Sequence, residues 1–266
     1  MKLNSNEERK CLICGKTLEK QKLDNFPNVF YIRCSCQIEQ EERERAAQIA
    51  AGHSLWYSAV LDVAGIPKRY RQYELGDIKP KDGQEAAFSA VSTWIHKYEN
   101  EREAEGVILS GGTGSGKTLL AAALGIAVIK LYPLDENAAQ QIGKHNKAEN
   151  IYTPIVFEST TKLFDKLHWA INQSSDEHER IMRKLEECKV LVLDDFGIGN
   201  LTEWQSKKLY DIVNARYTNN LPIIITTNEK PAVLEEYAGE RTFDRLREMC
   251  KFIVLTSKSQ RVTAGT

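Results

Sequence analysis

Short apolar runs alternate with longer amphipathic segments through most of the chain after residue 84. The apolar runs have the length of buried strands, and they lie at 107–110, 154–157, 190–193, 223–227 and 252–255. Apolar residues at helical spacing predict helices over 84–99, 117–131, from the second strand to about 172, 176–187, 203–219 and 240–249. Fully apolar strands separated by helices are typical of a parallel sheet covered on both faces. The pattern therefore predicts an α/β fold.

The pattern changes at the amino-terminal end and in one internal stretch. Residues 37–51 are mostly charged, with a helical pattern that should end before Gly52, which is typical of a solvated connector helix. Residues 132–153 are polar and are predicted to form a surface insertion. We therefore expect two domains: a small module with its connector helix, residues 1–51, and a larger domain, residues 52–266.

The composition is that of an ordinary globular protein, with 42% apolar and 27% charged residues in a chain of 266. The 36 Lys and Arg are balanced by 37 Asp and Glu, so a globally basic nucleic-acid binder is excluded while a local basic patch is not. The chain lacks an apolar run of membrane-spanning length, and its polar start does not resemble a signal peptide. We expect a cytoplasmic protein with no membrane partner.

Four of the six cysteines gather near the amino terminus in the pattern C-x2-C followed by C-x-C: Cys11, Cys14, Cys34 and Cys36. In a reducing compartment, two close pairs brought together by a hairpin predict a tetrahedral Zn²⁺ site, with Gly15 in the tight turn. So small a segment cannot bury much apolar surface, and a metal would supply the missing stability. The alternative is four unrelated thiols. Cys188 and Cys250 are expected to be core residues.

Residues 111–118 match the phosphate-binding pattern G-x-x-x-x-G-K-[ST] in full, after a predicted strand and before a predicted helix: Gly111, Gly112, Thr113, Gly114, Ser115, Gly116, Lys117 and Thr118. Glycines let the backbone curl so that N–H groups point at phosphates, and the helix terminus favours negative charge. Lys117 would reach the β- and γ-phosphates of ATP, and Thr118 would offer its hydroxyl to Mg²⁺. A chance glycine-rich turn does not account for this context.

Polar residues follow two of the predicted strands. Asp194 and Asp195 come directly after 190–193, where sheets of this class present residues to their ligands. We expect Asp194 to hold Mg²⁺, largely through water, and Asp195 to orient and deprotonate the attacking water. Asn228 follows 223–227 and would bond the γ-phosphate or that water; the alternative is a turn-forming Asn.

Two basic regions suggest further contacts. In the helix at 240–249, Arg241 and Arg245 lie opposite the apolar face, where an arginine could act on a neighbouring subunit, although by pattern alone a solvated face is the better interpretation. Candidate DNA contacts combine basic and aromatic groups: Lys162, Lys166, Trp169, Lys207 and Lys208. The alternative for this second set is a solvated helix face with Trp169 in the core.

Taken together, the motifs resemble those of bacterial or phage helicase loaders of the DnaC type, within the AAA+ ATPases, and of the related IstB transposition ATPases. The resemblance covers roughly residues 60–262, and it rests on 65–70, 111–118, 191–197, 212–217, 226–228, 239–241 with 244–247, and 259–261. The cysteine module followed by a charged helix also resembles the zinc-bearing amino-terminal regions of such loaders.

The resemblance implies a P-loop AAA+ parallel sheet with helices on both faces, a reduced lid, and a small zinc-ribbon-like module. It also implies roles for individual residues: Walker A for Lys117 and Thr118, Walker B for Asp194 and Asp195, sensor 1 for Asn228, arginine finger for Arg245 and sensor 2 for Arg261. The family often has Ser-Tyr-Arg where this chain has Ser259-Gln260-Arg261, which is a departure at sensor 2.

The function implied is that of an ATP-dependent helicase loader in DNA replication. The zinc module would bind a hexameric replicative helicase of the DnaB type, and the ATP-bound core would form a homo-oligomer and contact single-stranded DNA. ATP hydrolysis would release the loader. Two alternatives remain at this point: an IstB-like ATPase that assists a transposase on duplex DNA, and a nucleotide-switched binding adaptor with little turnover.

Overall fold

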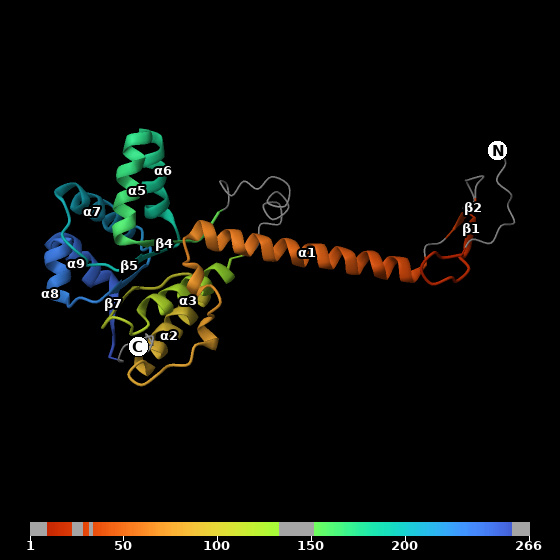
Figure 1. Ribbon diagram of the computed structural model, residues 1–266, viewed down its shortest axis with the longest axis horizontal. Coiled ribbons are helices and arrows are strands. Elements are labelled where there is room, and N and C mark those ends of the chain that lie inside the picture. The colour runs from red at the N-terminus through yellow and green to blue at the C-terminus, as the bar shows by residue number, and fades with distance from the viewer. Residues whose placement is uncertain (1–9, 23–28, 32–33, 133–151, 257–266) are drawn as a thin grey trace, which may run out of the picture. The chain divides into compact units, whose positions relative to one another are not determined.

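The computed structural model describes residues 10–22, 29–31, 34–132 and 152–256 (Figure 1). These residues form two compact units, one up to Trp56 and the other from Tyr57 onward. Nearly all of the insertion expected at 132–153 lies outside the described residues, and so does Arg261. Of the helices in the described ranges, none combines the length and apolarity needed to cross a membrane.

The first unit contains a small antiparallel sheet and the start of a long helix. Strand β1 (Lys20–Lys22) pairs with β2 (Val29–Tyr31). The turn that carries the first cysteine pair is closed by a bridge between Lys10 and Thr17. At its end Gly15 takes a φ of +71°, which glycine adopts without steric cost, so the tight turn expected there is confirmed.

The helix after the cysteines, α1 (Ser35–Ala64), is much longer than expected. The prediction that it ends before Gly52 is wrong. A glycine inside a helix costs only about 1 kcal/mol, and apolar residues at helical spacing beyond it, including Val60 and Leu61, are buried. The helix ends where Gly65 takes a φ of +82°, and a Cβ at that position would lie 2.2 Å from the Phe157 carbonyl oxygen.

The second unit contains a parallel sheet of five strands in the order β4-β5-β6-β3-β7. The bounds are β3 Gly106–Gly111, β4 Ile155–Ser159, β5 Val190–Asp194, β6 Ile223–Thr227 and β7 Cys250–Leu255, which confirms each predicted strand. The register pairs Ser159 with Asp194 and Ser110 with Thr227. The carboxyl ends of β4, β5, β6 and β3 therefore meet at one edge.

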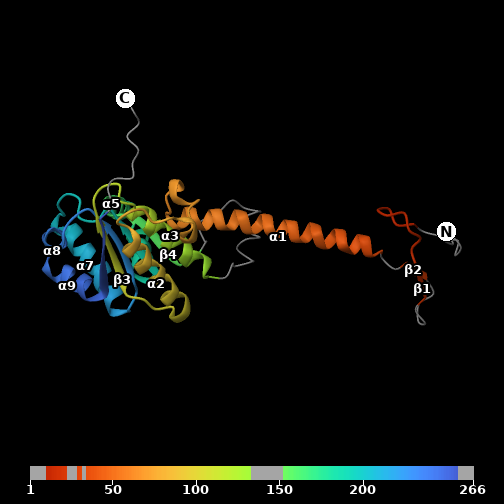
Figure 2. The ribbon, with the colours of Figure 1, turned by 90° about the horizontal axis from the view of Figure 1, so that it is seen from below.

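Helices cover both faces of this sheet, as predicted (Figure 2). Helices α2 (Glu85–Glu101) and α3 (Lys117–Lys130) lie on one face. The opposite face packs against α5 (Thr160–Gln173), α6 (Ser175–Glu187), α7 (Glu203–Thr218), α8 (Pro231–Ala238) and α9 (Glu240–Met249). Helix α8, which begins with a proline, was not predicted, and neither were the short 3-10 helices η1 (Lys68–Tyr70) and η2 (Leu75–Asp77).

The core explains why the strands read as continuous apolar runs. Leu191 and Leu193 of β5 pack against α7 and α9, through residues such as Ile212 and Leu246. Val192, which points the opposite way on the pleated strand, is equally buried. Both sides of each central strand therefore exclude water.

Arg216 of α7 is fully buried and acts as a structural clamp. Its guanidinium donates to the carbonyls of Leu185 and Cys188 at 2.9 Å and to that of Pro222 at 2.8 Å. It thus satisfies carbonyl oxygens at the end of α6, where a helix leaves them without partners. Cys188 and Cys250 are buried core thiols as predicted, and burial raises the pKa of Cys250 to about 12.

Candidate functional site

The phosphate-binding motif forms the turn between β3 and α3. Gly114 and Gly116 have φ values of +81° and +98°, so the loop depends on residues without a Cβ. The N-cap of α3 is Gly116, which has no side chain to cap the helix, and the amino end of a helix favours negative charge. The Lys117 ammonium donates to the carbonyls of Gly111 at 2.8 Å and Gly112 at 2.9 Å, close above the loop. This cradle fits a polyphosphate.

A pocket of about 190 Å³ opens over this loop at the carboxyl edge of the sheet. Its walls combine the loop with residues from other elements: Arg69, Tyr70, Thr113, Gly114, Gly116, Lys117, Thr118, Leu119, Asp195 and Asn228. The structure thus brings predicted phosphate-binding residues together with Asp195 and Asn228 in one cavity.

Arg69 and Tyr70 are pocket residues to which sequence reasoning gave no role. They belong to η1, within the 65–70 motif on which part of the resemblance rests. The Arg69 guanidinium lies 5.7 Å from the centre of the Tyr70 ring. A cation and an aromatic face at the rim suit a ligand that has both phosphates and a base.

Asp194 ends β5 and is nearly buried, with 7% of its surface exposed. Its Oδ1 accepts hydrogen bonds from the hydroxyl of Thr118 at 2.9 Å and from that of Thr226 at 2.5 Å. Burial raises the pKa of this carboxyl group, and the two hydroxyl donors oppose that rise. The bond to Thr118 joins the phosphate loop to the acidic strand end, and a hydroxyl beside a carboxylate is a ligand set that Mg²⁺ accepts.

Asp195 follows in the left-handed region, with a φ of +55° that is uncommon for a residue with a side chain. Its backbone N–H donates to the Thr226 hydroxyl at 3.0 Å, and the next N–H, of Phe196, donates to the Thr226 carbonyl at 2.8 Å. The Asp195 side chain is exposed at the pocket.

Gln84, immediately before α2, is a third residue to which the sequence assigned no role. It is 5% exposed, and its Nε2 donates to the Ser115 carbonyl of the phosphate loop at 2.6 Å. Its Oε1 accepts from the Lys81 N–H at 2.9 Å. Gln84 therefore ties the phosphate loop to a turn outside the motif, and no sequence pattern marks it.

Arg245 of α9 is not among the residues that line this pocket. Its guanidinium lies 4.8 Å from the ring centre of Tyr210 and 5.7 Å from that of Tyr217, both on α7. The Tyr217 hydroxyl in turn donates to Glu248 at 2.8 Å. The Arg245 Nε is buried and finds no hydrogen-bond partner within the described part of the chain. The two rings and the Arg241 carbonyl, which accepts from Arg245 Nη1 at 3.2 Å, hold this arginine in place.

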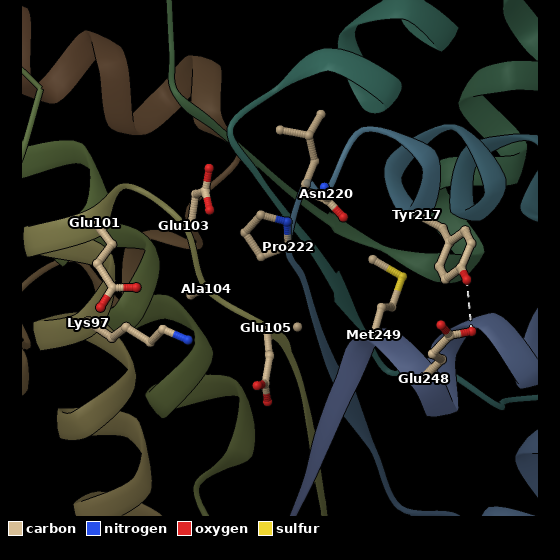
Figure 3. A pocket seen from close by; sticks show the side chains of 12 residues that line it. Lys97, Glu101, Glu103, Ala104, Glu105, Tyr217, Asn220, Pro222, Glu248 and Met249 are labelled. Carbon is tan, nitrogen blue, oxygen red and sulfur yellow. Dashed lines mark hydrogen bonds between the residues drawn. The ribbon is translucent and has the colours of Figure 1, made fainter.

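A second cavity of about 310 Å³ lies at the opposite edge of the sheet (Figure 3). Gly106, Pro222 and Met249 line this cavity, so it lies beside the amino ends of β3, β6 and β7. Four of its lining residues are acidic and one is a lysine: Glu101, Glu103, Glu105, Glu248 and Lys97. Such walls repel a triphosphate, so the smaller pocket over the glycine loop is the nucleotide candidate.

The four clustered cysteines meet in the first unit, with all sulfur atoms within 4.8 Å of one another. Cys36 Sγ lies 3.3 Å from both Cys11 Sγ and Cys34 Sγ, and Cys14 Sγ lies 3.5 Å from Cys34 Sγ. A tetrahedral Zn²⁺ with bonds of about 2.3 Å separates its sulfur ligands by about 3.8 Å. The cluster fits such an ion with only small adjustments.

The local backbone favours thiolates in part of this cluster. The N–H groups of Cys14 and Ile13 lower the pKa of Cys11 to about 6, and the Cys36 N–H lowers that of Cys34. Burial and the neighbouring sulfurs instead raise the pKa of Cys36. A bound cation reverses such a rise, because it stabilises every thiolate around it.

Apolar side chains are exposed beside the cysteines. Leu12 is 96% exposed and Ile13 is 52% exposed, both between Cys11 and Cys14, and Ile38 at the start of α1 is 44% exposed. We call Leu12, Ile13 and Ile38 the apolar tip. Contiguous apolar patches mark protein-binding surfaces, and these three side chains are candidates for such a patch in the first unit.

The candidate DNA residues of α5 share one exposed face. Lys162, Lys166 and Trp169 follow one another at helical spacing, and Lys166 bonds Glu158 at 3.3 Å. Trp169 is 55% exposed, so its alternative interpretation as a core residue is wrong. Lys207 is exposed, and Lys208 lies 3.9 Å from Asp211.

Comparison with known proteins agrees with this geometry. Residues 148–264 match the family of IstB-like ATP-binding proteins. The phage-like element PBSX protein XkdC of Bacillus subtilis is 24% identical over 230 residues, which cover 82% of this chain and 71% of XkdC. The replicative helicase loader DnaC of Escherichia coli is 22% identical over 166 residues. That match covers 62% of this chain but only 59% of DnaC, less than two thirds of its length.

A solved structure of a helicase loader has the same fold as the second unit. The crystal structure of a DnaC helicase loader superposes with a TM-score of 0.56 and 26% sequence identity, over 71% of this chain and all of the loader chain. The expected P-loop AAA+ fold is therefore confirmed for the second unit.

Proposed function

We propose that this chain, an IstB/DnaC-like AAA+ ATP-binding protein, is an ATP-dependent helicase loader that delivers a replicative helicase to single-stranded DNA. The observation that carries the proposal is the single pocket in which the phosphate loop, Asp195 and Asn228 meet. ATP hydrolysis requires groups that bind the phosphates, hold the metal ion and activate water within one cavity.

In this proposal the loop N–H groups and Lys117 bind the phosphates of ATP. Thr118 and Asp194, which already share a hydrogen bond, would hold Mg²⁺, which when bound neutralises charge on the β- and γ-phosphates. Arg69 and Tyr70, which line the same pocket, would flank the base and sugar end of the nucleotide. Gln84 supports the loop from below through the Ser115 carbonyl.

Hydrolysis falls to the exposed groups at the same edge. The Asp195 carboxylate orients the attacking water and accepts its proton, and the Asn228 amide bonds the γ-phosphate or that water. Arg245 acts on the nucleotide of a neighbouring subunit, which is consistent with its absence from its own pocket. Arg261 would complete the site from the carboxyl-terminal segment. The active form is therefore a homo-oligomer.

The cysteine unit is proposed to bind the helicase. Zn²⁺ held by Cys11, Cys14, Cys34 and Cys36 folds the turn that presents the apolar tip. Such a tip fits an apolar groove on another protein, and the charged residues around it suit a polar rim. The exposed face of α5 with Lys162, Lys166 and Trp169 is proposed to contact single-stranded DNA by charge and stacking.

A capture experiment tests this proposal. The full chain is immobilised and offered hexameric helicases of the DnaB type with and without ATP, beside a Cys14→Ser, Cys34→Ser control. We expect the helicase to be retained by the wild-type chain, lost by the control, and released as ATP is hydrolysed. Equal recovery from the control would contradict the role of the cysteine unit.

A second candidate function is ATPase assistance to a transposase, favoured by the match to IstB-like proteins over residues 148–264. The two functions differ in nucleic acid. A loader should be stimulated by single strands, whereas a transposition ATPase should be stimulated by duplex DNA and should retain a transposase in place of the helicase. An adaptor with little turnover should bind nucleotide without stimulation by either DNA.

A further inference from the structure

The Thr226 hydroxyl stands between the two acidic residues of the proposed ATP site. It donates to Asp194 Oδ1 at 2.5 Å and accepts from the Asp195 N–H at 3.0 Å. A hydroxyl has one proton to donate, so this pair of bonds uses Thr226 as both donor and acceptor at once. Thr226 is 1% exposed, so bulk water does not compete for these two hydrogen bonds.

The Thr226 backbone adds a third contact to the same segment. Its carbonyl accepts from the Phe196 N–H at 2.8 Å, so the N–H groups at both ends of Asp195 are anchored to one residue of β6. Asp195 lies between these anchors at a φ of +55°. A residue with a side chain keeps such a conformation only where its surroundings determine it, and Thr226 supplies two of the bonds that do so.

We propose that Thr226 is a positioning residue: it fixes the position of the metal-holding carboxylate of Asp194 relative to the water-activating carboxylate of Asp195. The inference rests on the proposed ATPase function. Thr226 is not among the residues that line the pocket, so the role we assign to it is exerted through the two aspartates. It acts by fixing a carboxylate on one side and a left-handed backbone on the other.

The chain provides a matched control for a loss of buried hydrogen bonds. Thr153 is 5% exposed and also makes one bond as donor and one as acceptor, both with the Ile155 backbone at the other end of β4. Thr153→Val therefore removes the same number of bonds without touching the pocket. Thr226→Val removes the hydroxyl with little change in volume, and Thr226→Ser keeps it.

The experiment compares the full chain with Thr226→Val, Thr226→Ser and Thr153→Val. ATP turnover gives kcat and KM, thermal unfolding gives Tm, and a Mg²⁺ titration follows binding of a fluorescent ATP analogue. For Thr226→Val we expect kcat to fall about 10- to 100-fold with KM within about 3-fold, and the Mg²⁺ concentration for half-maximal binding to rise. Thr226→Ser should retain kcat within about 3-fold.

The outcomes separate positioning from general stability. Thr153→Val should lower Tm as much as Thr226→Val does while keeping the wild-type kcat. If Thr226→Val keeps kcat and the Mg²⁺ dependence, or if Thr226→Ser fails as badly, the positioning role is wrong. If the wild-type chain binds the analogue but never hydrolyses ATP, the proposed ATPase function fails; the Mg²⁺ titration still decides whether Thr226 positions Asp194.

Discussion

The two units of this protein reach a defined site by different routes. In the second unit, residues such as Leu191 and Ile223 are fully buried on a five-stranded sheet, and the nucleotide pocket lies at the edge where those strands end. In the first unit, among side chains that the structure describes, the buried apolar residues are Cys11 and Trp56. Apolar burial therefore stabilises the second unit, and its pocket forms on that fold. The first unit buries little apolar surface, so we expect its fold to depend on a metal held by the cysteines.

The largest expected effect concerns the Zn²⁺ that we propose for the first unit, because its loss should unfold that unit. Structural Zn²⁺ contributes about 10–16 kcal/mol to the folding of small domains, far more than the few apolar contacts described there. Cys14→Ser with Cys34→Ser should abolish zinc retention and make the amino-terminal segment sensitive to protease. Zinc content per chain and limited proteolysis measure this.

We also expect the second unit to stay folded when the first unit loses its zinc. The double variant should bind the fluorescent ATP analogue as the wild-type chain does, because none of the pocket residues belongs to the first unit. The buried Cys250 supplies the control, since Cys250→Ser should keep its zinc. Loss of nucleotide binding together with zinc would show that the two sites are not independent.

The next effect separates binding from turnover within the pocket. Lys117→Ala should abolish binding of the ATP analogue, because it removes the cation above the loop carbonyls. Asp195→Asn should bind normally but lower kcat at least 100-fold, because an amide cannot accept the proton of water. Analogue fluorescence and phosphate release measure the two properties, and normal turnover by Asp195→Asn would contradict its assignment.

The apolar tip provides a test in the first unit that leaves the metal in place. Leu12→Asp should weaken helicase capture about 10- to 100-fold, because a charge would replace an apolar group at the centre of the contact. Leu55→Asp is the control, since Leu55 is also exposed, at 58%, and belongs to the same unit but to the helix. Both variants should keep zinc, and equal weakening by both would remove the tip as the contact.

Arg245 tests whether the second unit completes its site between subunits. Arg245→Ala should lower ATPase about 10-fold at protein concentrations where subunits associate, and should have no effect on binding by isolated chains. Tyr217→Phe keeps the ring beside the guanidinium but loses the bond to Glu248, so its effect should be smaller. ATPase measured across a protein dilution series distinguishes these results, and a concentration-independent defect would contradict action in trans.

Much of the second unit could be predicted because its signals are local and strong. Each central strand is apolar on both sides, and the eight consecutive residues 111–118 are enough to identify the phosphate-binding loop. The long helix was mispredicted because Gly52 was read as a stop, although burial of Val60 and Leu61 beyond it outweighs one glycine. Sequence periodicity does not include that tertiary gain.

The residues that were missed act across long sequence separations. Thr226 contacts Asp194 from a neighbouring strand, and Gln84 contacts Ser115 from the turn before α2. Their residue types are common, and only the sheet register and the packing of the loop give them a role. Tyr210 and Tyr217 were likewise unmarked, because a ring beside Arg245 follows from how α7 and α9 pack.

Gln84 gives the smallest effect and the finest test of how the fold supports its pocket. Gln84→Leu keeps the buried volume but removes the 2.6 Å bond to the Ser115 carbonyl and the bond from the Lys81 N–H. Because one neutral hydrogen bond contributes about 1 kcal/mol, affinity for the ATP analogue should fall about 5-fold. Gln84→Glu should weaken binding further, since a carboxylate repels both the carbonyl and a nearby phosphate. A fluorescence titration measures both variants. If Gln84→Leu matched the wild-type affinity, the phosphate loop would hold its shape through its own glycines alone, and the pocket would depend on the rest of the fold less than the structure indicates.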